Sequence, residues 1–503
     1  MRSSSGVSGL RSALLAENYS ESGLTSALGE AGRLSSFSSQ LTLQQRLQIT
    51  GSDDIPVVWR FFYCGLPVGF DDLAAALRPS GSTDDLIEAG LVSRDGDRAV
   101  PLVRITPFAE LLIVHDAEDG SDFKHEHVVG VGPAARSLAA LTVRPEVETA
   151  LDLGTGSGVQ ALLLAGHARR VTATDISGRA LDVARLNAEL NGIESIEFHN
   201  GDLYAPVADR TFDLIVANPP FVVSPEREYV FRDSGRVGDA ISEEVLRGTP
   251  HALNEGGFAH VLCSWVCESQ DDWSRPMEQW LAQSGCDAWV LCNKVDSALS
   301  YAAEWNRPLL RKSADAFCEA VSRWAQFYRQ RGIGFICTGA VILRKRSRGR
   351  NWVRTDLMPH RPTGPAGDHI LRVFEAQDHL QSSGSDDDLL DGVFSLVDGH
   401  LLDQRMSYRA HRYESPEARL YLENGVGLGV DVDPLVTHVL FRLDGTVPLR
   451  RIIDEAATDT GIERQQLTEV TLGSIRRLFG LGMLDSTTAA EYREVPSWTG
   501  PRP

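Results

Sequence analysis

The stretch "ALDLGTGSGVQALLLA", residues 150–165, joins an apolar strand, a glycine-rich turn and an apolar helix. Its glycines at 154, 156 and 158 let the backbone pass close to a ligand where a side chain would collide with it. A dinucleotide-binding G-x-G-x-x-G loop would need a further glycine at position 159, where this chain has Val159. The stretch therefore predicts a strand–loop–helix unit with a cofactor site that is not of the dinucleotide type.

Acidic residues lie at or near the ends of three successive predicted strands. Asp152 belongs to the first strand, Asp175 closes the next one, and Asp202 follows the third. Each alone is typical of a helix cap, but together with the D-x-G-x-G-x-G spacing they favour S-adenosylmethionine. We expect Asp175 to accept the two ribose hydroxyls, and Asp152 to orient a water molecule or the ammonium group. We expect Asp202 to accept the adenine amine, with Ile176 and Leu203 on the two sides of the ring.

Strand-like and helix-like segments alternate through residues 125–345. Alternation of this kind predicts an α/β fold with a mainly parallel sheet and helices on both faces. A longer helical insertion, at about 296–332, precedes the last strand. The seven strand candidates are 149–154, 170–176, 195–201, 212–218, 257–265, 287–294 and 334–345.

The fourth strand candidate runs directly into a rigid polar stop in "FDLIVANPPF", residues 212–221. The side-chain oxygen of Asn218 and the backbone carbonyl of Pro219 are suited to accept the two N–H groups of an amide or base amine. Two consecutive prolines, Pro219 and Pro220, stiffen the turn, and Phe221 offers a face on which a planar acceptor stacks. The pattern predicts methyl transfer to nitrogen; the alternative is a strand-ending turn with a buried phenylalanine.

These motifs, "DLGTGSG", "TDIS", "GDLY" and "NPPF", resemble those of class I S-adenosylmethionine-dependent methyltransferases of the "methyltransferase small" type. That group holds the HemK/PrmC-like glutamine N5-methyltransferases and the RsmC-like rRNA guanine N2-methyltransferases. The resemblance implies a seven-stranded Rossmann-like core. It implies cofactor contacts at Asp152, Gly154, Thr155, Gly156, Gly158, Asp175, Ile176, Asp202, Leu203 and Asn218. It implies an acceptor site made of Asn218, Pro219, Pro220 and Phe221.

Two departures from the family pattern leave the substrate open. Glutamine methyltransferases usually carry tyrosine where this chain has Phe221, which several RNA-modifying relatives use. The flanks resemble neither the N-terminal helical bundle of release-factor methyltransferases nor the duplicated half of the RsmC type. Upstream of the glycine loop, residues 125–141 supply a Gly-Pro turn and a helix that either closes over the methionine end of the cofactor or only packs on the sheet.

The flanks predict small additional units. A helix–helix–hairpin order predicts a winged-helix-like N-terminal unit, although "TDDLIEAG" (83–90) is acidic where a DNA-recognition helix would be basic. We expect it to bind a partner or to position the substrate. The expected divisions are a flexible leader (1–40) with one helix at about 10–28, the winged-helix-like unit (41–115), the methyltransferase domain (120–362), a second winged-helix-like unit (366–490) and a tail (491–503).

The densest positive run is "RKRSRGRNWVR", residues 344–354. It is interpreted either as a solvated hairpin arm or as a contact for RNA phosphates with a tryptophan for base stacking. The residues of the predicted RNA contact are Arg344, Lys345, Arg346, Arg348, Arg350 and Trp352.

Composition favours a globular protein in a reducing compartment. The net charge of −20 disfavours non-specific binding to a polyanion, although a local basic groove stays possible. Seven cysteines without C-x-x-C pairs or zinc spacing suggest free thiols and a cytoplasmic location. The sequence contains no run of about 18 apolar residues, so it predicts no membrane helix.

The leading hypothesis is a methyltransferase that modifies an exocyclic or amide nitrogen of a macromolecule, with rRNA or tRNA as the first choice. The main alternative is a protein glutamine, in a release factor or a ribosomal protein. A further alternative is a non-catalytic protein that senses S-adenosylmethionine and binds nucleic acid, but an intact amino-group cradle argues against a pure sensor. A small-molecule substrate and DNA adenine rank lower.

Overall fold

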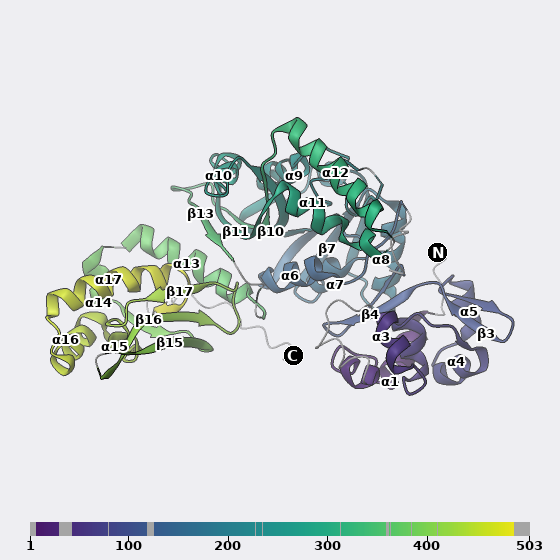
Figure 1. The fold of residues 1–503 in the computed structure, drawn as a ribbon, viewed down its shortest axis with the longest axis horizontal. Coiled ribbons are helices and arrows are strands. Elements are labelled where there is room, and N and C mark those ends of the chain that lie inside the picture. Colours follow the sequence, from purple (N-terminus) through teal and green to yellow (C-terminus); the bar gives the residue numbers. More distant parts are fainter. Residues whose placement is uncertain are drawn as a thin grey trace.

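The structure is a computed structural model that describes residues 7–29, 43–78, 80–117, 125–226, 228–233, 235–311, 313–358, 362, 364–383, 385–409 and 411–486. A central unit built on one large sheet lies between an N-terminal unit and a C-terminal unit (Figure 1). In Figure 1 the central unit is at the top, the C-terminal unit at the lower left and the N-terminal unit at the lower right.

Short helices and two small sheets make up the N-terminal unit. Its first sheet has the strand order β1-β3-β2, and β4 and β5 form a separate antiparallel hairpin. The elements are α1 (Val7–Ala16), α3 (Leu43–Thr50), the π-helix η1 (Trp59–Tyr63), β1 (Val68–Gly69), α4 (Phe70–Leu77), α5 (Thr83–Glu88), β2 (Val92–Asp95), β3 (Arg98–Pro101), β4 (Arg104–Phe108) and β5 (Leu111–His115). Helices α4 and α5 followed by the β2–β3 hairpin give the element order that the sequence predicts; that the unit works as a winged helix stays a prediction.

The expectation of a flexible leader over residues 1–40 is wrong for residues 7–29. Leu10 and Leu14 of α1 are fully buried, one helical turn apart, so α1 presents an apolar face to the N-terminal core. Tyr19 stacks on Trp59 at 4.1 Å between ring centroids and donates its hydroxyl to the Ile105 carbonyl at 2.7 Å. The helix expected within the leader at about 10–28 corresponds in part to α1, which ends at Ala16. Residues 1–6 and 30–40 lie outside the described part of the chain.

The central sheet has eight strands in the order β13-β11-β12-β10-β9-β6-β7-β8. All neighbouring pairs are parallel except the two that involve β12. The strands are β6 (Val147–Leu153), β7 (Ala168–Asp175), β8 (Ile196–Asn200), β9 (Phe212–Ala217), β10 (Leu253–Cys267), β11 (Cys286–Ser297), β12 (Phe335–Lys345) and β13 (Val353–Leu357). This confirms the predicted Rossmann-like α/β fold, with β13 as an eighth strand that the sequence did not indicate.

Helices cover both faces of this sheet, because alternate residues of the buried strands point to opposite sides. Ala150 and Leu214 pack in the cluster that contains α6 and α7, whereas Leu151 and Ile215 pack in the cluster that contains α9 and α10. The helices are α6 (Pro133–Leu141), α7 (Val159–Leu164), α8 (Gly178–Leu190), α9 (Ala240–Ala252), α10 (Arg275–Leu281), α11 (Ala298–Asn306) and α12 (Ala314–Arg331), with short 3-10 turns at Ala205–Val207 and Arg307–Arg311.

The C-terminal unit shares its hydrophobic core with the central sheet. Phe374 and Phe479 belong to the same buried cluster as Trp289 and Ile342 of strands β11 and β12. Its two three-stranded sheets have the orders β18-β14-β19 and β15-β16-β17. The elements are α13 (Gly367–Ser383), α14 (Asp386–Asp391), β14 (Val393–Leu396), β15 (His400–Arg409), β16 (Arg412–Leu422), β17 (Gly429–Val432), α15 (Thr437–Leu440), β18 (Asp444–Pro448), α16 (Leu449–Thr460), α17 (Arg464–Gly480) and β19 (Leu484–Ser486). The sequence-based expectation of helices with a small hairpin missed β15–β17; a winged-helix character stays a prediction here too.

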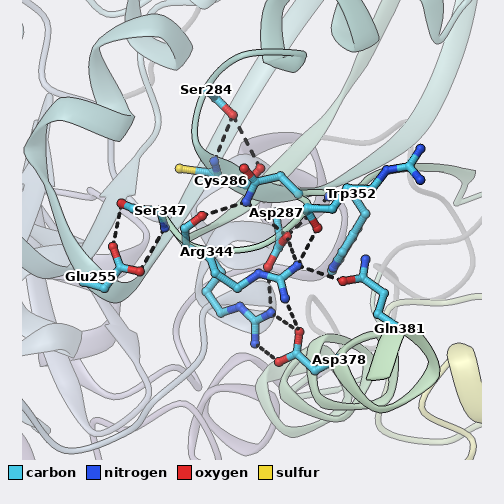
Figure 2. A network of polar contacts seen from close by, with 12 residues as sticks. Glu255, Ser284, Cys286, Asp287, Arg344, Ser347, Trp352, Asp378 and Gln381 are labelled. Atoms are coloured by element: carbon cyan, nitrogen blue, oxygen red, sulfur yellow. Dashed lines mark hydrogen bonds and ion pairs between the residues drawn. The ribbon is translucent and has the colours of Figure 1, made fainter. Parts of the chain in front are cut away.

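Arg344 and Arg346 of the basic run lie in the contact between the central sheet and α13 (Figure 2), whereas residues 347–350 are exposed. Arg344 and Arg346 each pair with the fully buried Asp287 of β11, at 2.7 and 2.8 Å. Both also pair with Asp378 of α13, at 2.6 and 3.2 Å. Two guanidinium groups and two carboxylates thereby compensate one another's charges where the two units meet.

The predicted RNA contact is therefore wrong for most of the residues proposed. Besides Arg344 and Arg346, Lys345 donates to the Pro250 carbonyl at 2.9 Å, and Trp352 packs against Phe374 with ring centroids 4.8 Å apart. The segment connects β12 to the unpredicted strand β13, and within it residues 347–350 are exposed, as the expected solvated arm would be. Arg348 and Arg350 alone of the proposed residues are exposed.

Within the described residues, no helix is long and apolar enough to cross a membrane.

Candidate active site

The glycine-rich loop between β6 and α7 is held open toward one side. Gly154, Gly156 and Gly158 have φ values of 75°, 55° and 87°, which residues with side chains rarely adopt. A Cβ atom built on Gly154 or Gly156 would meet no atom within 4 Å, whereas one on Gly158 would lie 3.1 Å from the Ala184 side chain. The first two glycines therefore border free space suited to a ligand, and the third lets the loop approach α8 closely.

Asp152 holds this loop through hydrogen bonds from Thr155 and Ala161. Its side chain is buried, and its Oδ2 accepts hydrogen bonds from the Thr155 hydroxyl at 2.6 Å and the Ala161 amide at 2.9 Å. Burial raises the pKa of this carboxyl to about 7. Asp152 thus fixes the loop and the first turn of α7; its direct contact with the cofactor stays a prediction.

Asp175 lies beside the loop because β7 is the parallel neighbour of β6. Its Oδ2 accepts the Gly156 amide at 2.9 Å and its Oδ1 accepts the Ser177 amide at 2.8 Å. Burial raises the pKa of the Asp175 carboxyl, although these backbone bonds act in the opposite direction. Each oxygen has a second lone pair, so the carboxylate fits two ribose hydroxyls. Ile176 follows with 58% of its surface exposed. An adenine ring bound at the predicted position would cover this apolar side chain.

Asp202 follows β8 at the same edge of the sheet and has a partner that the sequence did not reveal. Its Oδ2 accepts a hydrogen bond from Arg236 at 2.9 Å, and Arg236 also pairs with Glu244. An adenine amine at this position would share the carboxylate with the guanidinium. Leu203 has a positive φ of 44° and packs against the buried cluster that contains α9 and α10.

The Asn-Pro-Pro-Phe turn leaves the sheet next to the glycine-rich loop. Ala217, the last residue of β9, is in register with Leu153, the last residue of β6. Asn218 and Gly154 therefore leave adjacent strands at the same level of the sheet. The predicted cofactor and acceptor residues meet at the carboxyl edge.

The turn itself differs in one respect from the expectation. The Phe221 amide donates to the Pro219 carbonyl at 2.7 Å, so this carbonyl has one lone pair left for a substrate N–H. Asn218 is half-buried, and Phe221 packs partly against the core that contains β6 and β9. Phe221 also forms a single antiparallel bridge with Asp233.

The helical insertion before β12 anchors the exit of this turn. The Tyr328 hydroxyl of α12 donates to the Val223 carbonyl at 2.7 Å, and the Val223 amide donates to the Tyr301 hydroxyl of α11 at 3.3 Å. Farther along, Glu226 accepts hydrogen bonds from Arg323 and Trp324 of α12. The insertion therefore holds the chain directly after the acceptor turn, a role that the sequence did not indicate.

The segment upstream of α6 lies against the chain that follows the turn. The Val230 amide donates to the His125 carbonyl at 3.1 Å, and the rings of His127 and Phe231 are 5.7 Å apart. Leu138 and Leu141 of α6 are buried in the sheet core. The helix thus packs on the sheet, while closure of the 125–141 segment over the methionine end of the cofactor stays a prediction.

Residues 131–264 match the family model of the methyltransferase small domain, and these residues contain the loop, the acids and the acceptor turn. The central unit is a class I S-adenosylmethionine-dependent methyltransferase domain of this type. Residues 371–486, in the C-terminal unit, match a domain of unknown function, DUF7782.

Glutamine methyltransferases are among the curated relatives of the domain. A "Ribosomal protein uL3 glutamine methyltransferase" of Bradyrhizobium diazoefficiens is 40% identical over 126 residues, which are 22% of this chain and 40% of the relative. A "Release factor glutamine methyltransferase" of Chlorobaculum tepidum is 38% identical over 173 residues, 31% of this chain and 57% of the relative. The chain thus spans about half the length of these relatives.

Among solved structures, a ribosomal protein L11 methylase from Lactobacillus delbrueckii subsp. bulgaricus aligns with 30% identity and a TM-score of 0.23. The alignment covers 31% of this chain and 67% of that one. A TM-score this low does not bear on the activity of this chain.

Proposed function

We propose that this protein transfers a methyl group from S-adenosylmethionine to the side-chain amide nitrogen of a glutamine in a protein substrate. The observation that carries the proposal is the position of Asn218, which leaves β9 beside the Gly154 end of β6. The glutamine methyltransferases similar to this chain support the choice of acceptor.

The residues of the turn suit an amide acceptor. A glutamine amide nitrogen is a weak nucleophile because its lone pair is delocalised into the carbonyl. When bound, S-adenosylmethionine supplies an electrophilic methyl group on a sulfonium. The Asn218 side-chain oxygen and the remaining lone pair of the Pro219 carbonyl accept the two N–H groups, which fixes the direction in which the nitrogen faces. The stiff Pro219–Pro220 pair keeps both acceptors in place.

The same cradle distinguishes substrate from product. The amide nitrogen exchanges one N–H proton for the methyl group, so the product retains one N–H for two acceptors. A monomethylated glutamine therefore binds the turn with one hydrogen bond fewer than the unmodified side chain. We expect one methyl group per glutamine.

An RNA base, the first choice from the sequence, has lost its main support. Arg344 and Arg346 pair with Asp287 and Asp378, so their charges are already compensated within the protein. A protein substrate is compatible with a net charge of −20, which repels a polyanion. Phe221 in place of tyrosine does not oppose it, because either ring offers a flat face to a planar amide.

Labelled-methyl transfer tests the proposal. The purified chain is incubated with methyl-labelled S-adenosylmethionine and, separately, with protein, ribosomal RNA and tRNA from cells that lack the chain. We expect label in the protein fraction, recovered after complete proteolysis as N5-methylglutamine. Label confined to RNA would overturn the glutamine assignment, and label in no fraction would favour a sensor that binds the cofactor without turnover.

A further inference from the structure

Side chains of α8 complete the outer edge of strand β5. Asn187 accepts the Val114 amide at 2.7 Å through Oδ1 and donates to the Val114 carbonyl at 2.9 Å through Nδ2. Asn191 makes the same pair of bonds with Leu112, at 3.0 and 2.8 Å. Four residues of helix span about 6 Å and two residues of strand about 6.6 Å, so the two amides match the spacing of the strand. They stand where a neighbouring strand would pair.

Asn187 makes one additional bond, to the glycine-rich loop. Its Nδ2 also donates to the Ser157 carbonyl at 2.8 Å, and the side chain is fully buried. The next loop residue, Gly158, approaches Ala184 of α8 so closely that a Cβ atom would lie 3.1 Å from it. A single buried amide thus holds a strand of the N-terminal unit and the loop of the predicted cofactor site.

Asn191, one turn farther along α8, supplies a natural comparison. Its remaining contacts are with the Asn187 carbonyl at 2.8 Å and with Arg11 of α1 at 2.6 Å. Both asparagines therefore dock β5 in the same way, and only Asn187 contacts the loop. The two positions separate docking of the N-terminal unit from control of the loop.

We propose that Asn187 is a positioning residue that couples the N-terminal unit to cofactor binding. Docking of the β4–β5 hairpin on α8 favours the loop conformation that binds S-adenosylmethionine, and cofactor binding strengthens docking by the same factor, because such coupling is reciprocal. This inference rests on the proposed function, since it takes S-adenosylmethionine to be the ligand of the loop. A protein that binds the N-terminal unit and displaces β5 would change cofactor affinity without touching the crevice.

Hydrogen exchange of the wild-type protein tests the coupling directly. Exchange of the Val114 amide is measured with and without saturating S-adenosylmethionine, and calorimetry on the same sample establishes binding. We expect the cofactor to slow this exchange by at least about fivefold, the lower end of typical coupling between sites. An unchanged Val114 rate in a sample that binds the cofactor would overturn the coupling and leave the proposed function intact. A wild type that bound no S-adenosylmethionine would overturn both.

Two matched variants separate coupling from simple docking. Asn187→Asp keeps the size of the side chain and its acceptor for Val114, but it loses the donors to Ser157 and Val114. We expect it to weaken S-adenosylmethionine binding by at least about fivefold. Asn191→Asp makes the equivalent change at Leu112 and should lower that affinity clearly less, because it weakens docking without removing a bond to the loop. Equal losses of affinity in the two variants, both folded by circular dichroism, would contradict a specific role for Asn187; should Asn187→Asp fail to fold, the wild-type exchange measurement decides.

Discussion

Asp175 combines two tasks, since it accepts backbone amides of the loop and faces the predicted ribose position. Asp175→Ala removes both proposed bonds to the ribose, and hydrogen bonds to a charged group contribute about 1.5 to 3 kcal/mol each. We expect S-adenosylmethionine affinity to fall at least about a hundredfold by calorimetry. Asp202→Ala is the control, because that carboxylate is half exposed and shared with Arg236. It should cost about tenfold or less. A larger loss at Asp202 than at Asp175 would reverse the two assigned roles.

Asp152 should leave a signature in the pH dependence of stability. Burial raises its pKa from 3.8 to about 7, so the folded protein holds a proton that the unfolded chain releases near pH 4. The resulting stabilisation is complete below about pH 4 and is lost as the pH rises through about 7. Between pH 5 and 8, the wild type should lose roughly 2 to 3 kcal/mol more unfolding free energy than Asp152→Asn, which does not titrate. Urea unfolding at both pH values measures this, and equal losses would place the Asp152 pKa near its ordinary value.

At the scale of elements, the sequence predicted the strands that are continuously buried. The runs that became β6, β7 and β9 each contain four consecutive buried residues near their carboxyl ends, and the acids and the amide lie at these ends by the geometry of a parallel sheet. Strand β13 was not predicted, because most of its residues are half exposed and "VRTDL" contains no apolar run. The role of Asn187 was not predicted either, because a polar residue on a helix does not indicate which strand edge its side chain will contact.

The contact between β11, β12 and α13 makes a prediction about charge. Asp287 is fully buried between the guanidinium groups of Arg344 and Arg346, whereas Asp378 is 41% exposed. Asp287→Ala leaves two half-buried guanidinium groups with Asp378 as their remaining shared partner and should cost about 3 to 5 kcal/mol of unfolding free energy. Asp378→Ala should cost clearly less, because water replaces that carboxylate in part. Denaturant unfolding of both variants decides, and equal costs would contradict the assigned burial.

At the scale of the whole molecule, the C-terminal unit and the central sheet share one core. Trp289 and Ile342 of the sheet lie in one cluster with Phe374 and Phe479. A chain cut after residue 362 would expose this apolar surface, so we expect it to unfold or aggregate. Circular dichroism and gel filtration measure the result. A soluble, folded fragment would show that the methyltransferase domain does not need the DUF7782 region for stability.

Sequence reasoning reached less far for the flanking units. Their functions depend on partners, and their surfaces carry no motif comparable to "NPPF". The basic run shows the difficulty, since five arginines and a lysine near a tryptophan resemble a nucleic-acid surface. Only the positions of Asp287 and Asp378, distant in sequence, reveal that two of the arginines are compensated internally.

The most direct measurement compares cofactor binding and methyl transfer in Asn218→Ala with those in Asn254→Ala. Asn254 lies at the opposite edge of the sheet, where its amide donates to Asp213 at 2.7 Å, so it controls for loss of a partly buried asparagine. We expect Asn218→Ala to bind S-adenosylmethionine and to transfer methyl groups to protein at least about a hundredfold more slowly. Asn254→Ala should retain both activities. Full transfer by Asn218→Ala would contradict the claim that this turn holds the nitrogen that is methylated.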